Sequence, residues 1–273
     1  MTGGGVSSTT SLSNQRPESA RFPVALALRV TQFTHRYAQT TALHDITIAV
    51  PAGTLLALVG ESGSGKTTLL RAFNRTIEPQ AGCVFVDERD VTTVDPVALR
   101  RSIGYVPQSG GLLPHWNVGR NVALVPTLTQ HADPARAARS ALELCGLSPT
   151  TFYDRYPHEL SGGQRQRVAI ARALAAQQGA VLLDESFSAL DAISRSEVLD
   201  AFASIRAELG FTAVLVTHDL GEAVRLADAI AVMRAGRIEQ TGTFHDLVEH
   251  AASPYVAALV DRARASARLL AEA

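Results

Sequence analysis

A chain of 273 residues is long enough to bury one sizeable core, and 46% hydrophobic with 19% charged residues is an ordinary balance for a globular protein. The formal net charge of −1 argues against a nucleic-acid binder that works through bulk positive charge, so no nucleic acid is expected as a partner. Two cysteines without metal-type spacing favour a reduced, cytosolic protein. No apolar run approaches the ~20 residues that a membrane helix needs, so any role at a membrane is expected to go through a partner.

The first predicted elements are a leader and a β-rich region. Residues 1–22 are rich in Gly, Ser and Thr, a composition that predicts a flexible leader. Alternating apolar residues over 24–33 predict a strand, and residues 44–60 predict two more strands around a Pro-Ala-Gly turn. Residues 67–75 are predicted to be a helix. Short strands are then expected at 82–87 and 102–107.

A helical block is expected over residues 110–178, with a helix start at Asp133-Pro134 and a stop at Gly146. Strands are then predicted at 180–184, 212–217, 229–233 and 237–240, with helices between the first three. Strands that alternate with helices indicate a mainly parallel sheet covered on both faces. We therefore expect an α/β fold with an antiparallel N-terminal β part and the helical block as an inserted subdomain. One domain is expected to span residues 23–273.

The stretch GESGSGKT, residues 60–67, matches the phosphate-binding pattern G-x-x-x-x-G-K-[ST] without a mismatch. It follows an apolar strand and opens a helix, which is the context that a P-loop requires. Lys66 is expected to reach the β- and γ-phosphates, and the Thr67 hydroxyl to bind Mg²⁺. The residues expected to bind the nucleotide here are Gly60, Glu61, Ser62, Gly63, Ser64, Gly65, Lys66, Thr67 and Thr68. The chain is therefore predicted to be a P-loop NTPase.

Two adjacent carboxylates end the apolar strand at 180–184. Neighbouring residues on a strand point to opposite faces, so the two acids are expected to have different roles. Asp184 is expected to help hold Mg²⁺, and Glu185 to orient a water molecule for attack on the γ-phosphate. His218 and Gln108 each follow another predicted strand, at the edge where open α/β sheets bind ligands.

A second glycine turn, LSGGQ at residues 160–164, opens a helix that carries basic residues. Free N–H groups and the helix dipole make such a turn a second place to hold phosphate. Taken in order, these motifs resemble the nucleotide-binding subunit of ATP-binding cassette (ABC) transporters over residues 24–259. The resemblance implies that Tyr37 stacks on adenine and that Gln108 links Mg²⁺ and the attacking water to the membrane subunit. His218 would contact the γ-phosphate.

The same resemblance explains two phosphate sites in one chain. LSGGQ is the family signature, and in this family the signature of one protomer caps the ATP held by its partner. A second copy of the chain, paired head to tail, is therefore implied as a partner. The residues implied to bind ATP across that interface are Ser161, Gly162, Gly163 and Gln164, together with Asp191 of the neighbouring D-loop. The implied ligands are ATP and Mg²⁺, and the implied activity is ATP hydrolysis.

Membrane permease subunits are the other implied partners, with a substrate-binding protein acting indirectly and the chain on the cytoplasmic, inner face of the membrane. Residues 103–126 resemble the stretch found in ATPases that serve uptake of osmoprotectants such as glycine betaine and choline. Leu112, Leu113 and Trp116 could contact the permease or pack within the helical subdomain. The alternatives are another cargo (amino acid, lipid or export), a soluble non-transport ABC ATPase and a P-loop kinase.

One position departs from the family pattern. Ser186 stands where that family usually has proline, immediately after Glu185. Serine removes a backbone restraint, which is expected to loosen the geometry around the water-positioning carboxylate. Glu185 itself is present, so the catalytic assignment is kept.

Overall fold

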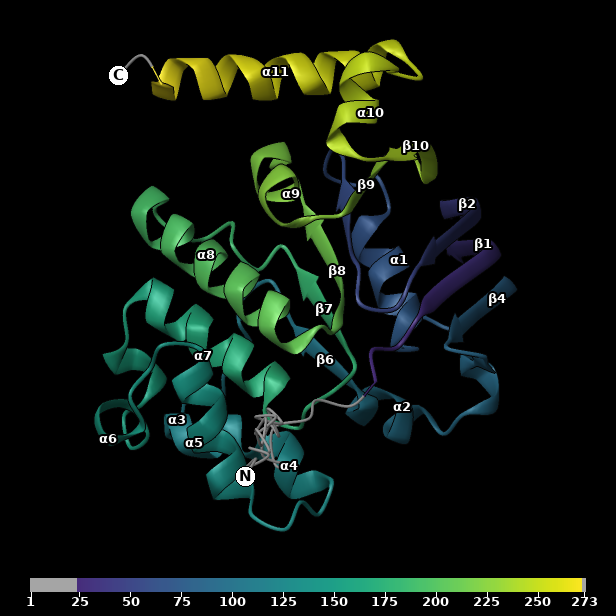
Figure 1. Ribbon diagram of the computed structural model, residues 1–273. Helices are drawn as coiled ribbons and strands as arrows, with labels where there is room; N and C mark the ends of the chain where they lie inside the picture. Colours follow the sequence, from purple (N-terminus) through teal and green to yellow (C-terminus); the bar gives the residue numbers. More distant parts are fainter. Residues whose placement is uncertain (1–23, 272–273) are drawn as a thin grey trace, which may run out of the picture.

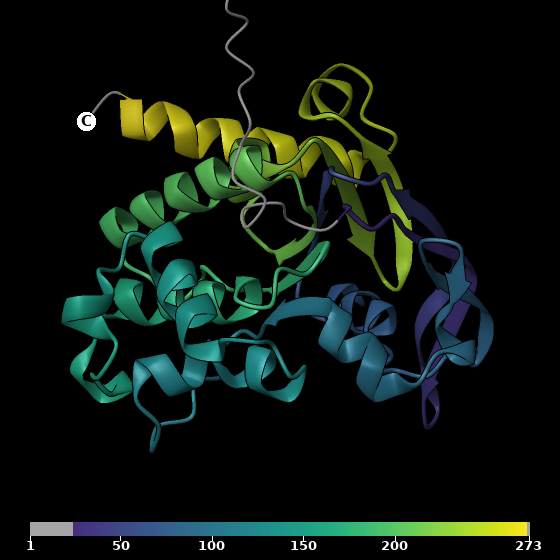
Figure 2. The same cartoon turned by 60° about the horizontal axis from the view of Figure 1, so that its bottom comes forward.

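The computed structural model describes residues 24–271, with side chains through residue 265. The leader expected over residues 1–22 lies outside the described residues. The described chain forms a six-stranded and a four-stranded sheet with helices packed around them (Figure 1). In both views the helices of residues 118–174, in teal, lie on one side of the larger sheet. The four-stranded sheet, in purple and blue, lies on the other side (Figures 1 and 2).

The larger sheet positions the site and has the strand order β10-β9-β3-β8-β7-β6. Its strands are β3 (Leu55–Val59), β6 (Ile103–Val106), β7 (Ala180–Asp184), β8 (Thr212–Thr217), β9 (Ala229–Arg234) and β10 (Arg237–Gly242). Every pair is parallel except β10 on β9. β3, β7 and β8 are buried along their whole length, as strands covered on both faces must be. Parallel pairing brings the carboxyl ends of these strands to one edge, where ligands bind in such sheets.

The smaller sheet is antiparallel throughout and has the order β2-β1-β4-β5. Its strands are β1 (Leu28–Tyr37), β2 (Thr40–Val50), β4 (Ala81–Val86) and β5 (Arg89–Asp90). β1 begins later than expected and continues to Tyr37. An irregularity at Gln32, whose φ is +51°, shifts the alternation of buried residues after Val30, so the alternation does not show that the strand continues past Phe33. The fold class, mainly parallel α/β with an antiparallel β part, is confirmed.

Helices connect the strands and cover both faces of the larger sheet. In chain order they are α1 (Lys66–Phe73), α2 (Pro96–Ser102), α3 (Val118–Val122), α4 (Leu124–Leu128), α5 (Pro134–Leu144), α6 (Pro149–Phe152), α7 (Gly162–Leu174), α8 (Ala192–Leu209), α9 (Leu220–Leu226), α10 (Phe244–Glu249) and α11 (Pro254–Ala271). Short 3-10 turns occupy Val91–Thr93 and Pro157–Glu159. The start of α5 is as expected, because the Asp133 side chain accepts a hydrogen bond from the Arg136 N–H.

The helices α3, α5, α6 and α7 share one continuous core with the larger sheet. Apolar residues of α5 and α7 pack with those of β7, β8 and α8 in a single cluster. A second cluster joins β1, β2 and β4 to α1 and the opposite face of the larger sheet. Among the described helices, none combines the length and apolar character that a bilayer crossing requires.

Candidate functional site

The phosphate loop between β3 and α1 is shaped by its glycines. Gly65 has φ +99° and is the N-cap of α1, and no side chain caps that end of the helix. A Cβ atom on Gly65 would lie 2.8 Å from the Ala42 carbonyl oxygen and 2.7 Å from Leu43 Cδ2. Only glycine therefore fits this loop. The first N–H groups of α1 can therefore donate hydrogen bonds to an anion.

Lys66 is held inside this loop, with 4% of the residue exposed. Its ammonium donates to the carbonyl oxygens of Gly60 at 2.8 Å and Glu61 at 2.7 Å, and lies 3.3 Å from Ser64 Oγ. Burial lowers the pKa of Lys66, an effect opposed by the nearby charges of Glu185 and Asp184. The arrangement places a desolvated cation at the base of the loop, where a phosphate oxygen would gain most from it.

Asp184, at the end of β7, is 2% exposed and receives three donors. The Thr67 hydroxyl donates to Oδ1 at 2.8 Å, and Tyr105 and Arg71 donate to Oδ2 at 3.1 and 3.3 Å. Thr67 and Asp184, predicted as metal ligands, therefore lie together as an oxygen pair of the kind that Mg²⁺ prefers. Tyr105 and Arg71 were not predicted. Only their positions, on β6 beside β7 and one turn into α1 after Thr67, could have indicated them.

Glu185 has a different environment from its neighbour. β7 ends at Asp184, and Glu185 has φ +46°, so a turn separates the two carboxylates. We expected the two acids to have different environments because neighbouring strand residues point to opposite faces. Their environments do differ, but the cause is the turn at Glu185 and not strand alternation. Gln108 Nε2 donates to Glu185 Oε2 at 3.1 Å, and His218 Nδ1 lies 3.8 Å from the same oxygen. Two predicted residues, each just after another strand, thus converge on the carboxylate of a third.

A cavity of about 440 Å³ joins these parts. Its lining residues are Tyr37, Ala42, Ser62, Gly63, Gly65, Lys66, Thr67, Thr68, Gln108 and Glu185. Tyr37 comes from the end of β1, is 48% exposed and meets the His35 ring edge-on at 4.7 Å. This arrangement suits a nucleotide. Its base would lie against the exposed Tyr37 ring, and its terminal phosphate would lie near the Glu185 carboxylate.

The signature residues lie elsewhere. Ser161 is the N-cap of α7. Its hydroxyl accepts a hydrogen bond from the Gln164 N–H at 3.2 Å, and its own N–H donates to Gln164 Oε1 at 3.0 Å. Together with Gly163 they line a separate hollow of about 220 Å³. Asp191 is the N-cap of α8 and accepts from the Ser194 N–H at 3.0 Å, and this bonding lowers the pKa of Asp191. The predicted phosphate loop and the predicted signature turn therefore do not share a cavity.

A further group of charged residues was missed by sequence reasoning. Arg195 donates to the carbonyl oxygens of Ser188 at 3.4 Å and Leu190 at 3.0 Å, both before α8. It also lies 3.6 Å from Asp219 and 3.8 Å from Glu222, just after His218 in the chain. Burial raises the pKa of Glu222, whose carboxylate accepts the Thr217 hydroxyl. These contacts join the segment after Glu185 to the segment after β8.

Comparison with known proteins agrees with this geometry. The sequence model of the ABC transporter family matches residues 43–188, more than half of the chain. The chain belongs to the ABC transporter family. It resembles the solved dimeric structure of a post-hydrolysis ATP-binding cassette bound to ADP and Pi, with a TM-score of 0.71 and 29% identity. That alignment covers 79% of this chain and 98% of the solved one.

Several curated ABC proteins are similar over most of this chain. It is 42% identical over 225 residues to the carnitine transport ATP-binding protein OpuCA of Listeria monocytogenes. Identity is also 42% to the choline transport ATP-binding protein OpuBA of Bacillus subtilis, and 43% to the sulfate/thiosulfate import protein CysA of a Synechocystis strain. The alignments cover 82%, 82% and 85% of this chain, and 56%, 59% and 64% of those proteins. The chain thus spans little more than half the length of the first two relatives.

Proposed function

We propose that this chain is the ATP-hydrolysing subunit that energises an ABC importer. The observation that carries the proposal is the convergence of Gln108 and His218 on Glu185, beside a phosphate loop and in one cavity with Tyr37. A binding module without catalysis would have no need of a hydrogen-bonded carboxylate at the γ-phosphate end of the site. The relative bound to ADP and Pi shows hydrolysis products in a cassette of this fold.

In the proposed reaction the Tyr37 ring stacks on the base, and the loop N–H groups and Lys66 bind the phosphates. Glu185 accepts a proton from a water molecule whose oxygen attacks the γ-phosphorus, and ADP leaves with the electrons of the broken bond. Gln108 and His218 hold the Glu185 carboxylate through the contacts at 3.1 and 3.8 Å. His218 also faces the γ-phosphate as a donor.

Mg²⁺ fits the oxygen pair of Thr67 and Asp184. Within the described residues no group of three or more His, Cys, Asp or Glu side chains could hold a metal alone. A cation here would thus share its coordination with phosphate oxygens and water, as Mg²⁺ does with nucleotides. When bound, Mg²⁺ supplies positive charge that neutralises the phosphate oxygens. Gln108 is the third proposed ligand.

A second copy completes the site. Ser161, Gly162, Gly163 and Gln164 lie outside the cavity that contains Lys66, so they are free to cap a nucleotide held by another chain. Asp191 would contribute from the same side. The proposed dimer is head to tail and closes around two ATP molecules. Support comes from the dimeric state of the related cassette.

The proposed membrane partner is a multi-span permease, which would hold the chain at the cytoplasmic face, with a substrate-binding protein acting on the permease. Leu112 packs against the helical core, and Trp116 is half-buried under the Arg120 guanidinium at 4.0 Å. This leaves Leu113 and the Trp116 ring as the proposed permease contacts. We place the domain at residues 23–273, with the helical subdomain inserted at about 110–178.

For the cargo we propose a quaternary amine such as carnitine, choline or glycine betaine. The support is the 42% identity to the carnitine and choline transport proteins. Sulfate is the second candidate, because identity to a sulfate/thiosulfate import protein is equally high. A purified binding protein that co-purifies with the complex can be titrated with each compound. Tight binding of sulfate without binding of quaternary amines would contradict the first choice.

The proposed activity is tested with Glu185→Gln in the full chain. The amide keeps the shape but cannot take a proton from water, so hydrolysis should fall at least 100-fold. MgATP should still bind and should hold two copies together, which size-exclusion chromatography detects as a nucleotide-dependent dimer. The wild-type chain with ADP is the control, and it should elute as the smaller species. Hydrolysis at the wild-type rate would remove Glu185 from the catalytic role.

A further inference from the structure

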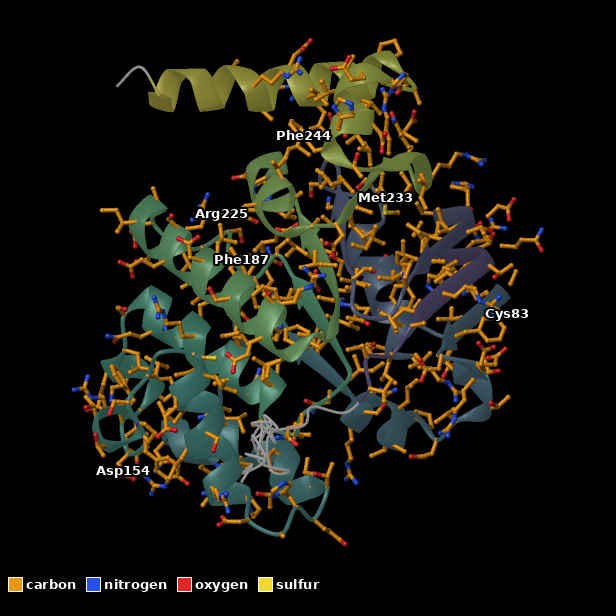
Figure 3. All side chains as sticks on the ribbon, in the orientation of Figure 1. Cys83, Asp154, Phe187, Arg225, Met233 and Phe244 are labelled. Carbon is orange, nitrogen blue, oxygen red and sulfur yellow. The ribbon has the colours of Figure 1, made fainter. Side chains whose placement is uncertain are left out.

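Ser186 is buried between two catalytic loops. It follows Glu185, is 3% exposed, and its hydroxyl donates to the Val106 carbonyl oxygen at 3.1 Å. Val106 is the last residue of β6, two positions before Gln108. The next residue, Phe187, labelled in Figure 3, is fully buried with its ring 6.2 Å from that of Phe202. The hydroxyl is thus bonded to a strand end, and the residue that follows Ser186 is anchored in the core.

The backbone of Glu185 needs such fixing. Its φ of +46° lies in the left-handed region, which residues with a Cβ atom enter only when the surroundings hold them there. On one side the Glu185 N–H donates to the Val216 carbonyl oxygen of β8 at 3.0 Å. On the other side, Ser186 makes the bond to Val106 of β6. The loop is therefore tied to both strands whose ends carry His218 and Gln108.

We propose that Ser186 is a positioning residue for hydrolysis, whose bond to Val106 sets the distance between Glu185 and Gln108. This inference rests on the proposed ATPase function and deepens it. Where serine was expected to loosen this turn relative to proline, its hydroxyl supplies a restraint of another kind. Tyr105, also on β6, donates a hydrogen bond to Asp184 and so supports the proposed Mg²⁺ ligand. Ser186 supports Glu185, the residue proposed to orient the water.

Removing the hydroxyl should affect turnover and leave nucleotide binding unchanged, because Ser186 does not line the nucleotide cavity. Ser186→Ala should lower kcat about three- to tenfold, the loss expected for one hydrogen bond that holds the reacting geometry. KM for ATP and the Kd of a fluorescent ATP analogue should stay within about twofold. Ser186→Cys, which keeps the volume with a weak donor, should behave like alanine. Ser186→Thr keeps the hydroxyl and should retain most of the turnover.

Ser102→Ala is the matched control. The Ser102 hydroxyl also donates to a carbonyl oxygen, that of Leu99 at 2.8 Å, but Ser102 lies at the opposite end of β6. The Ser102→Ala variant should change Tm about as much as Ser186→Ala and leave kcat unchanged. Equal losses of kcat in both variants, or a slower Ser186→Ala accompanied by weaker nucleotide binding, would overturn the proposal. So would a Ser186→Ala variant within twofold of wild-type turnover.

The route through Gln108 is tested by a double-mutant cycle in the full chain with its co-purified membrane subunits. If Ser186 acts by setting the contact at 3.1 Å, then adding Ser186→Ala to Gln108→Ala should cost little beyond Gln108→Ala alone. Fully multiplicative losses would overturn this route. A wild-type chain that hydrolyses no ATP would overturn the proposed function and this inference together. Normal hydrolysis in both wild type and Ser186→Ala would overturn this inference alone.

Discussion

At the scale of single residues, two neighbouring carboxylates are given different chemistry by their surroundings. Asp184 is 2% exposed and accepts hydrogen bonds from Thr67, Tyr105 and Arg71, which fix the direction of its carboxylate. Glu185 has a side chain that is 23% exposed and lines the cavity next to the phosphate loop. Environments that separate two adjacent acids in this way indicate separate roles. The first suits a metal ligand and the second a base.

Lys66 offers a direct test of the phosphate loop. It is the only lysine in the sequence, so Lys66→Ala removes one well-defined ammonium. We expect MgATP affinity to fall at least tenfold, since a charged hydrogen bond to phosphate contributes about 1.5–3 kcal/mol. Titration with a fluorescent ATP analogue measures this. Arg100→Ala, which removes a cation from α2, should leave the affinity unchanged. Equal affinity in Lys66→Ala and wild type would remove Lys66 from phosphate binding.

At the scale of elements, α7 connects two functional segments. Its first residues follow the Ser161 cap, and near its other end Arg172 donates to the carbonyl oxygens of Gly111 at 2.6 Å and Gly110 at 2.8 Å. These two glycines follow Gln108 in the chain. Burial lowers the pKa of Arg172, which reflects how far its guanidinium is withdrawn from water. A single helix thus links the signature to the loop that carries the proposed permease contacts.

Arg172→Ala should loosen that loop and leave the nucleotide pocket unchanged. Losing a forked bond to two carbonyls should lower the free energy of unfolding by about 1–3 kcal/mol. Hydrogen exchange over residues 108–113 should become faster, which mass spectrometry of peptides detects. Arg167→Ala, on the same helix but bonded to Cys145 and Glu197, is the control and should leave this exchange unchanged. Unaltered exchange in Arg172→Ala would show that other contacts hold the loop.

At the scale of the whole molecule, two cysteines report on the two halves of the fold. Cys83 is exposed on β4 of the smaller sheet, where Figure 3 labels it. Cys145 is buried in the core shared by the helical block and the larger sheet. Burial raises the pKa of Cys145 to about 12, so its reactive thiolate is scarce at neutral pH.

Thiol labelling should therefore distinguish the folded from the opened protein. In the native chain at pH 8 a chromogenic disulfide should modify Cys83 quickly and Cys145 only after the core opens. Cys83→Ser should show no fast reaction, and its slow reaction should speed up with denaturant as the helical block separates from the sheet. Fast labelling of Cys145 in native Cys83→Ser would contradict the burial of Cys145.

The sequence by itself determined what contiguous stretches encode. The phosphate loop, the Asp133 cap of α5, the signature turn and the mainly parallel sheet depend on local spacing and on alternation of strands and helices, so they could be predicted. Family membership followed from the order of these stretches. Element ends were less predictable, because a bulge such as that at Gln32 breaks the alternation on which strand prediction depends.

Only the tertiary structure decided which side chains meet. Gln108, Glu185 and His218 follow three different strands, and their convergence depends on strand order and register. The left-handed turn at Glu185, the bond from Ser186 and the separation of the phosphate loop from the signature turn also depend on the tertiary structure. The physical reason is that hydrogen bonds between distant segments form only after the sheet has brought their carbonyls and side chains within reach. A local sequence pattern gives no information on the distance between such segments.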